Sequence, residues 1–230
     1  DGAWLKQNQL PFYVGGAELN VATALAFWGV PSSYFTALPN NAMADQVLDH
    51  VQQRNIDTTL IQRSGERIGI YYLPKGKDLK NAGVIYDRAH SSFATLQPGS
   101  IDWEKVLEGV SWFHFSAICP ALNQAAAAIC LEAVKAASAR NIPISIDLNY
   151  RAKLWNFCDD AHREKIMTEL TSYCDIVLGN EEDAEKHFGI HPEGLDVHKD
   201  SHDVKAEAFL SVCKQMMEKF PRAKKVITTL

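Results

Sequence analysis

The sequence is poor in cysteine and has no cysteine spacing that is typical of a metal site. Its 230 residues include five cysteines, an odd number, and no two of them form a Cys-x-x-Cys pair. They are Cys119, Cys130, Cys158, Cys174 and Cys213. Neither a disulfide framework nor a zinc site is indicated, and free thiols in a reducing cytoplasm are expected.

Long hydrophobic runs and an excess of positive charge are missing as well. No apolar run approaches the roughly 20 residues that a membrane span needs, and no signal peptide opens the chain. Lysine and arginine number 23 against 28 aspartates and glutamates, which gives a formal net charge of −5. We therefore expect a cytoplasmic protein with no membrane and no nucleic acid among its partners. An anionic ligand would need a local basic site.

Glycine and proline are also infrequent, with 13 and 9 residues, which excludes a collagen-like or low-complexity chain. What is present is a regular alternation of helical and strand-like stretches. The expected helices cover residues 17–28, 43–54, 121–139, 161–172 and 204–219, with a short helix from residue 182. The expected strands cover residues 32–38, 110–115, 142–146, 175–178 and 225–229. This alternation predicts an α/β fold with a parallel sheet covered by helices on both faces.

One region breaks the alternation. Residues 67–73 and 84–90 read as two strands with no helix between them, joined by the turn-rich stretch Pro74-Lys75-Gly76-Lys77. The pattern predicts an antiparallel hairpin inserted between two α/β stretches, and a small lid sheet is the natural interpretation.

Polar residues follow three successive strands. The first strand ends at Ser116, the second runs into residues 147–151 (DLNYR), and the third runs into residues 180–183 (NEED). Each group alone could be ordinary turn formers and helix caps. In open α/β sheets, however, ligands bind beyond the carboxyl ends of the strands. Because all three groups lie on that edge, we expect a ligand-binding cleft there.

A pair of glycines precedes the first helix in the stretch GGAELN, residues 15–20. Glycines before a helix let backbone N–H groups approach a ligand closely, and a helix N-terminus favours oxygen-rich or anionic groups. A capping role explains Gly16 equally well. It does not explain Asn20, one turn into the helix, where a ligand hydroxyl would. The stretch is neither a Walker A loop nor a G-x-G-x-x-G motif.

The hairpin carries a second candidate group. A two-residue period places Tyr86, Arg88 and His90 on one face of their strand and puts Tyr71 on the same face as Arg67. An arginine beside a tyrosine suits a carboxylate or phosphate, because guanidinium binds such groups with two parallel hydrogen bonds. The alternative is a solvated face, since charged residues also protect the edges of sheets.

The histidines give weaker signals. His187 and His191 are four residues apart, but Gly189 and Pro192 interrupt any helix that would hold both, and His198 and His202 lie in a polar stretch. For both pairs we expect solvated surface positions. His114 lies in an apolar strand and is expected to be a hydrogen-bonded buried histidine. No Ser/His/Asp order or nucleophile elbow is present.

Four motifs in the right order resemble the ribokinase-like PfkB family of sugar kinases. They are GGAELNVATALAFWG (residues 15–29), FHFSAICPAL (113–122), SIDLNYRAKLW (145–155) and VLGNEEDAEKHFG (177–189). Together they are most similar to the motifs of 2-keto-3-deoxygluconate kinases within that family. The resemblance implies a three-layer α/β/α sandwich with a mostly parallel sheet and a β-sheet lid. On this basis residues 1–230 form a single, incomplete kinase domain, with lid strands around 12–15, 67–73 and 84–90.

The resemblance also implies roles for particular residues, with the sugar acid held between the lid and the strand ends. The substrate-binding residues would be Gly16, Ala17, Asn20, Tyr71, Tyr86, Arg88, Ile118 and Arg151. Arg151 would in addition stabilise charge on the transferred phosphate. Asn149, Asn180 and Thr229 would lie toward ATP. Asp183 would organise Mg²⁺ through water, because it stands at the fourth position of the family's N-x-x-E motif.

Asp183 departs from the glutamate of that motif, and the family's G-A-G-D motif is absent. The latter supplies the anion hole and the base that takes the proton from the sugar hydroxyl. In the family it follows the strand near which this sequence ends, so the base is expected beyond Leu230. The first family strand is also missing before Asp1. The sequence thus resembles the central portion of the enzyme, and we expect no appreciable kinase turnover from these 230 residues alone.

The resemblance implies transfer of the ATP γ-phosphate to the 6-hydroxyl of 2-keto-3-deoxygluconate, by a homodimer or higher homo-oligomer that pairs through the lid. Arg88 next to Tyr86 favours an acidic sugar. One alternative is a fructokinase or another PfkB sugar kinase, and a second is a non-catalytic sugar-acid-binding fragment. A doubly wound NAD-binding domain is disfavoured, because no glycine fingerprint follows a strand and opens a helix with an acidic residue about 20 positions later.

Overall fold

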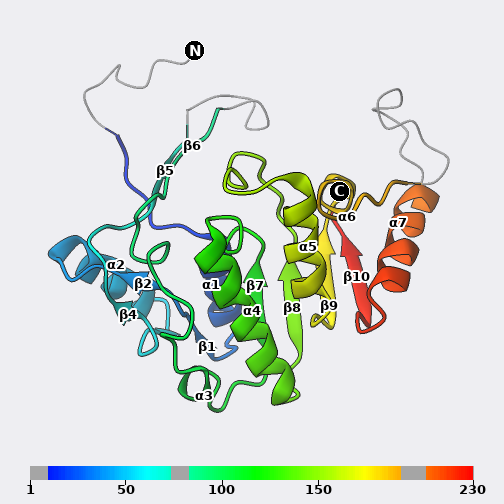
Figure 1. Ribbon diagram of the computed structural model, residues 1–230. Coiled ribbons are helices and arrows are strands. Elements are labelled where there is room, and N and C mark those ends of the chain that lie inside the picture. The colour runs from blue at the N-terminus through cyan, green and yellow to red at the C-terminus, as the bar shows by residue number, and fades with distance from the viewer. Residues whose placement is uncertain (1–9, 74–82, 193–205, 230) are drawn as a thin grey trace. The chain divides into compact units, whose positions relative to one another are not determined.

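The computed structural model describes residues 10–73, 83–192 and 206–229 (Figure 1). Backbone contacts divide the chain into two compact units, Asp1–Leu96 and Gln97–Leu230.

The first unit begins with two helices, α1 (Ala17–Phe27) and α2 (Ala42–Gln52). Gly16 stands at the N-cap of α1, and α1 ends before Gly29, whose φ of 75° requires the left-handed conformation that glycine adopts easily. The N-cap of α2 is Asn41, whose side-chain oxygen accepts the Ala44 N–H at 2.9 Å. Both helices lie within one or two residues of their expected positions.

The expected strand 32–38 appears as two short strands, β1 (Ser32–Ser33) and β2 (Ala37–Leu38). β1 pairs in parallel with β3 (Ile56–Asp57), and β2 pairs in parallel with β4 (Gln62–Arg63). The segment changes partner because residues 58–61 form a turn, closed by the hydrogen bond from Ile61 N–H to Thr58 O at 3.0 Å. The continuous run 32–38 therefore pairs with two different strands.

Two apolar clusters hold these elements of the first unit together. One contains Leu19, Ala22, Val51 and Ile56, from α1, α2 and β3. The other contains Leu38, Ala44 and Ile61, with Val47 and Leu48 of α2 packed against it. The apolar face of α2 thus packs inward through Ala44, Val47, Leu48 and Val51, while Met43 is exposed.

The inserted hairpin is present but shorter than expected. β5 (Ile70–Tyr72) and β6 (Ile85–Asp87) form an antiparallel pair in which Tyr71 lies opposite Tyr86. The turn predicted at residues 74–77 lies outside the described residues. Residues 12–15, expected as a third lid strand, are described but have no strand conformation. His90 does not continue the face of Tyr86 and Arg88, because β6 ends at Asp87 and His90 turns at a φ of 56°.

The second unit is built on a four-stranded parallel sheet with the order β10-β9-β8-β7. The strands are β7 (Phe113–Ser116), β8 (Ile144–Asp147), β9 (Ile176–Gly179) and β10 (Lys225–Thr228). The helices between them are α4 (Gln124–Ala139), α5 (Asp160–Thr171), α6 (Glu181–Phe188) and α7 (Ala206–Lys219). A short helix that the sequence pattern did not predict, α3 (Trp103–Val106), precedes β7 and is capped by Asp102.

Consecutive helices of this unit contact one another, α4 with α5, α5 with α6 and α6 with α7 (Figure 1). Because each strand pairs with the next along the chain, right-handed crossovers place these helices in one layer on one face of the sheet. The buried core between the sheet and the helices includes Phe115, Ile144, Ile146, Val177, Val134, Met167, Leu170, Met216 and Phe220. In the described part of the chain, no helix is long and apolar enough to cross a membrane.

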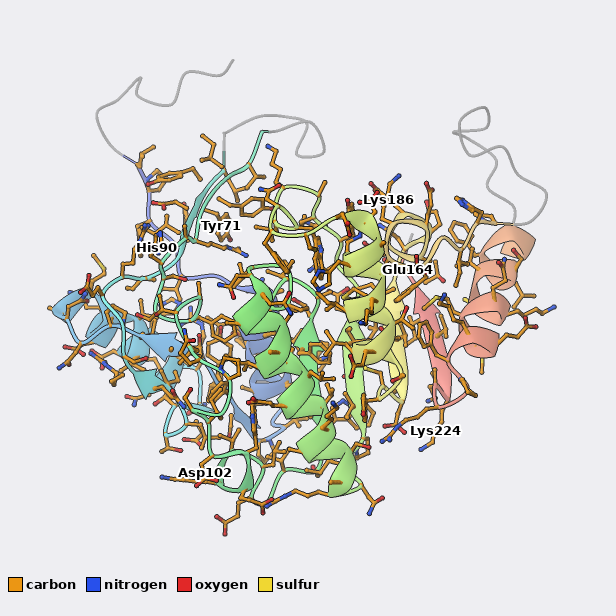
Figure 2. All side chains as sticks on the ribbon, in the orientation of Figure 1. Tyr71, His90, Asp102, Glu164, Lys186 and Lys224 are labelled. Carbon is orange, nitrogen blue, oxygen red and sulfur yellow. The ribbon has the colours of Figure 1, made fainter. Side chains whose placement is uncertain are left out.

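A charged cluster closes the amino-terminal end of this sheet. Asp175, just before β9 and only 7% exposed, accepts the Ile144 N–H at 3.0 Å and lies 3.0 Å from Lys224 Nζ. Arg222 lies 3.5 Å from the same carboxylate and donates to Ser138 of α4. Burial disfavours the charged form of Asp175, but these partners outweigh it and lower the pKa of the carboxyl. Lys224 lies at the opposite end of the unit from Lys186 of α6 (Figure 2).

Candidate active site

The residues that the sequence singles out fall into two groups, one in each unit. The group in the first unit combines the glycine corner before α1 with the hairpin. The group in the second unit follows the carboxyl ends of the parallel strands.

Arg88 is the central charge of the first group. Its guanidinium lies 5.0 Å from the ring centroid of Tyr86 and 5.5 Å from that of Tyr71, within the range of a cation–π interaction. The other hairpin arginine, Arg67, is neutralised by Asp87 at 2.7 Å. No carboxylate of the described residues pairs with Arg88. The hairpin thus holds a half-buried cation near two aromatic rings, with hydrogen-bond donors that an anion could use.

The glycine corner lies against the same hairpin. A Cβ added to Gly15 would stand 2.9 Å from the Tyr71 hydroxyl, and one added to Gly16 would stand 3.7 Å from the Tyr34 hydroxyl. Tyr71 is labelled on the hairpin in Figure 2. Asn20 is exposed on the first turn of α1, and its backbone N–H donates to Gly16 O at 2.9 Å. The structure therefore brings Gly15 to the hairpin tyrosine, and Gly16, Ala17 and Asn20 follow it at the N-cap and first turn of α1.

In the second unit, pairing continues one residue past the ends of the strands. The Ala117 N–H donates to Asp147 O, and the Leu148 N–H donates to Leu178 O, each at 2.8 Å. The Thr229 N–H donates to Gly179 O at 3.0 Å. Neighbouring strands are about 4.8 Å apart, so the segments that follow them line one edge. The predicted residues on this edge are Ile118, Asn149, Arg151, Asn180, Asp183 and Thr229.

Arg151 is a cation on this edge. It is exposed, and its Nη1 donates to its neighbour Tyr150 O at 2.6 Å. Among the residues that the structure describes, no carboxylate pairs with it. Asn149 precedes it with a φ of 32°, in the left-handed region that asparagine tolerates better than most residues. The turn after β8 is thus sharp, and it leaves a guanidinium available for a phosphate or a carboxylate.

Asp183 is placed differently from a metal ligand. It is 6% exposed, and each of its carboxylate oxygens accepts a backbone N–H, from Tyr150 at 2.7 Å and from Asn180 at 2.8 Å. The Asn180 side chain in turn accepts the Asp183 N–H at 2.8 Å, which completes a capping box at the start of α6. Within the described ranges, no group of three His, Cys, Asp or Glu side chains could hold a metal ion. The residues present therefore do not fit a directly coordinated Mg²⁺.

His187 corrects the sequence interpretation, which placed it on a solvated surface. It is fully buried in α6, and its Nε2 lies 3.0 Å from Leu148 O. A carbonyl oxygen only accepts, so Nε2 carries the proton and donates. Burial lowers the pKa of His187 to about 4. The spacing of Asp183, Ala184, His187 and Phe188 along one helical face was the signal for this burial, and all four are buried.

Two further residues of this edge were not singled out by the sequence. Tyr150 meets the His187 ring edge-on, with ring centroids 5.2 Å apart, and Arg163 lies 5.3 Å from the centroid of the Tyr150 ring. The Nε and Nη2 of Arg163 donate to Lys186 O at 3.2 and 2.7 Å. An arginine that is 8% exposed on α5 thus connects α6 to the turn after β8.

The other histidines behave mostly as expected. His114 Nδ1 lies 2.8 Å from Ser145 Oγ, which also accepts the Trp112 Nε1–H at 2.9 Å. The predicted hydrogen bond of this strand histidine is therefore confirmed, but His114 is half-buried and not buried as expected. His191 is exposed, while His198 and His202 lie outside the described residues.

Several known proteins are similar to this chain in sequence and fold. The 2-dehydro-3-deoxygalactonokinase of Haloferax volcanii is 29% identical over 152 residues, which cover 66% of this chain and 48% of that protein. The 2-dehydro-3-deoxygluconokinase of Dickeya dadantii is 27% identical over 150 residues, covering 61% of this chain and 48% of that protein. The crystal structure of 2-dehydro-3-deoxygluconokinase from Thermotoga maritima superposes with a TM-score of 0.84 at 38% identity, covering 96% of this chain and 64% of that one.

The chain spans about half the length of the sequence relatives it matches. Its family match, in contrast, extends over residues 2–230 and is to the pfkB family of carbohydrate kinases. This match agrees with the parallel sheet, the hairpin and the two unpaired arginines described above, and it excludes the NAD-binding interpretation. The chain belongs to the pfkB family of carbohydrate kinases.

Proposed function

We propose that this chain binds 2-keto-3-deoxygluconate, also named 2-dehydro-3-deoxygluconate. It positions this sugar acid for phosphorylation by ATP at the 6-hydroxyl. The single observation that carries the sugar-acid assignment is Arg88. Its guanidinium lies within cation–π distance of the Tyr71 and Tyr86 rings and has no carboxylate partner among the described residues. A neutral sugar such as fructose offers it no charge, whereas a sugar acid offers a carboxylate that guanidinium binds with two hydrogen bonds. The names of the relatives above support the same class of substrate.

The second unit would serve the phosphates. Arg151 is the cation that would stabilise charge on the transferred group, and phosphoryl transfer depends mainly on positioning and charge stabilisation. Asn149, Asn180 and Thr229 would line the ATP side of the same edge. Mg²⁺ would arrive with the nucleotide, since the described residues provide no direct coordination site for it. We assign the role of proton acceptor to no residue of this chain.

Calorimetric titration tests the substrate. Purified chain, shown to be folded by circular dichroism, is titrated with 2-keto-3-deoxygluconate, with its galactonate epimer and with fructose. We expect both acids to bind and fructose to bind at least tenfold more weakly, as a lost charged hydrogen-bond pair costs about 1.5–3 kcal/mol. A preference for fructose would remove the sugar-acid assignment while leaving the family unchanged. The ratio of the two acids decides between the epimers.

Substitution of Arg88 tests the residue. Arg88→Ala should weaken binding of the acids by about tenfold or more and leave fructose binding nearly unchanged. Arg67→Ala is the matched control, since Arg67 stands on the same hairpin but is already paired with Asp87. If Arg88→Ala weakened the binding of the acids and of fructose equally, Arg88 would not bind the carboxylate.

Assembly and location belong to the same proposal. We infer a cytoplasmic homodimer that pairs through the hairpin, because two short strands leave open edges on which a second copy could extend the sheet. Ile85 of β6 and Leu73 after β5 are about half exposed there. Sedimentation of the chain against an Ile85→Lys variant tests this pairing, and an unchanged dimer in the variant would place the interface elsewhere.

A further inference from the structure

Helix α6 is tied to the turn that follows β8 by three separate links. Asp183 accepts the Tyr150 N–H, His187 donates to Leu148 O, and the carbonyl of Lys186 receives the guanidinium of Arg163, which covers the Tyr150 ring. Every link from α6 reaches backbone or ring atoms between Leu148 and Tyr150. This turn carries Asn149 and leads directly into Arg151.

The Asp183 link joins two backbone segments. Its two oxygens reach the Tyr150 and Asn180 amides at 2.7 and 2.8 Å, and these amides belong to the segments after two neighbouring strands. The segments approach closely, since a Cβ added to Gly179 would stand 3.0 Å from Leu148 Cδ1 and 3.2 Å from an Asp183 oxygen. Both oxygens are thus engaged in joining the two segments.

The His187 link lies one helical turn further on. Its ring is buried against Tyr150, Trp155 and Phe188. Its Nε2–H satisfies the Leu148 carbonyl at 3.0 Å. Its Nδ1 is buried with no hydrogen-bond partner among the described residues. A histidine with one nitrogen unsatisfied is a costly way to fill a core, so the donated hydrogen bond is the property that an apolar residue would not supply.

We propose that Asp183 and His187 are positioning residues that hold the turn at residues 148–151, and with it Arg151, in place for phosphate binding. This inference rests on the proposed function of Arg151. It assigns Asp183 a role on the protein backbone in place of the role at Mg²⁺ that the family motif suggests. Neither side chain touches the substrate in this role, and both act through the turn.

The first test uses the unmodified chain and requires no ligand. Amide hydrogen exchange by NMR should show the Tyr150 and Asn180 amides protected as strongly as amides of the neighbouring strands. The ¹⁵N shifts of His187 should show the proton on Nε2. Rapid exchange of both amides, or a proton on Nδ1, would overturn the proposal whether or not the chain binds nucleotide.

The second test uses matched substitutions. Asp183→Asn presents an N–H to one of the two amides, so at least one of them should exchange about tenfold faster. ATP binding should weaken about tenfold, by the same factor with Mg²⁺ and with EDTA. Glu182→Gln removes the same charge from an exposed neighbour in α6 and should change neither quantity. Weakening confined to Mg²⁺-ATP, with both amides still protected, would return Asp183 to the metal and overturn the proposal.

His187 provides an independent pair of variants. His187→Leu fills a similar volume without a donor and should weaken ATP binding like Asp183→Asn. His187→Gln can still donate to Leu148 O and should restore binding to near that of the unmodified chain. His191→Leu is the control on an exposed histidine. Identical ATP affinities for the Leu and Gln variants would remove His187 from the proposal. If the unmodified chain binds no ATP, the proposed function fails, while the exchange data still test whether Asp183 and His187 hold the turn at residues 148–151.

Discussion

The hydroxyl of Tyr71 lies 2.9 Å from the position that a Cβ on Gly15 would occupy. The contact joins the corner before α1 to the hairpin of the first unit. Only glycine leaves this space free, so the position of the tyrosine depends on the residue at 15.

Gly15→Ala should therefore move Tyr71 and weaken sugar-acid binding severalfold. The far end of a tyrosine shifts easily, so the free energy of unfolding should change by no more than about 0.5 kcal/mol. Calorimetry and urea denaturation measure the two effects. Gly83→Ala is the control, because a Cβ there meets open space. Unchanged affinity in Gly15→Ala would mean that the Tyr71 position is unimportant for the ligand.

The Tyr86 ring should matter more than its hydroxyl for holding Arg88. Tyr86→Phe keeps an aromatic face 5.0 Å from the guanidinium, whereas Tyr86→Leu removes it. A cation–π contact is worth about 0.5–1 kcal/mol at such sites. The Leu variant should bind the sugar acid about two- to fivefold more weakly than the Phe variant. Equal affinities would show that the ring does not position Arg88.

Asp175→Asn should destabilise the second unit. The substitution removes the charge that faces Lys224 and Arg222 and weakens the hydrogen bond from the Ile144 N–H. We expect a loss of about 2 kcal/mol in urea denaturation, as for other buried charged hydrogen bonds. Asp45→Asn breaks the exposed pair with Arg63 and should cost less than about 1 kcal/mol. Equal losses of unfolding free energy in both variants would show that the buried charged cluster of Asp175 is no more stabilising than an exposed ion pair.

His187 should make the protein less stable as the pH falls. Its folded pKa of about 4 lies below the usual 6.5, so between these values the unfolded chain binds a proton that the folded chain does not. The free energy of unfolding should fall by about 3 kcal/mol across this window through this residue. His187→Leu should flatten that part of the profile, and His191→Leu should not. A profile with the same slope in His187→Leu would disprove the assignment.

The periodicity of the sequence was sufficient for the helices and for the parallel strands of the second unit. α4, β8, α5 and β9 begin and end within a few residues of the expected positions. Local patterns decide such elements, because alternating burial and helix caps act over a few residues. Asn123, Asp159 and Asn180 cap helices with their own side chains.

Other features depended on contacts between distant residues. The run 32–38 is one apolar stretch in the sequence, yet the turn at 58–61 divides its pairing between β3 and β4. The spacing along α6 indicates that His187 is buried, but its hydrogen bond to the carbonyl of Leu148, 39 residues earlier, depends on the tertiary structure. Asp183 stands at the glutamate position of the family's N-x-x-E motif, and each of its oxygens accepts a backbone N–H, one of them from Tyr150 in a different segment.

The sequence by itself determined the family and the α/β pattern, and it placed the candidate residues at strand ends and on the hairpin. Motifs and periodicity are local properties, so they can be recognised without knowledge of the tertiary packing. Tertiary structure alone decided which polar groups already have partners. Arg67 is neutralised by Asp87 and Arg88 is not, and Asp183 is engaged while Arg151 is free of carboxylates among the described residues. Which polar group has a partner depends on hydrogen bonds and ion pairs between residues that are far apart in the sequence. Their distance in space cannot be obtained from the sequence alone.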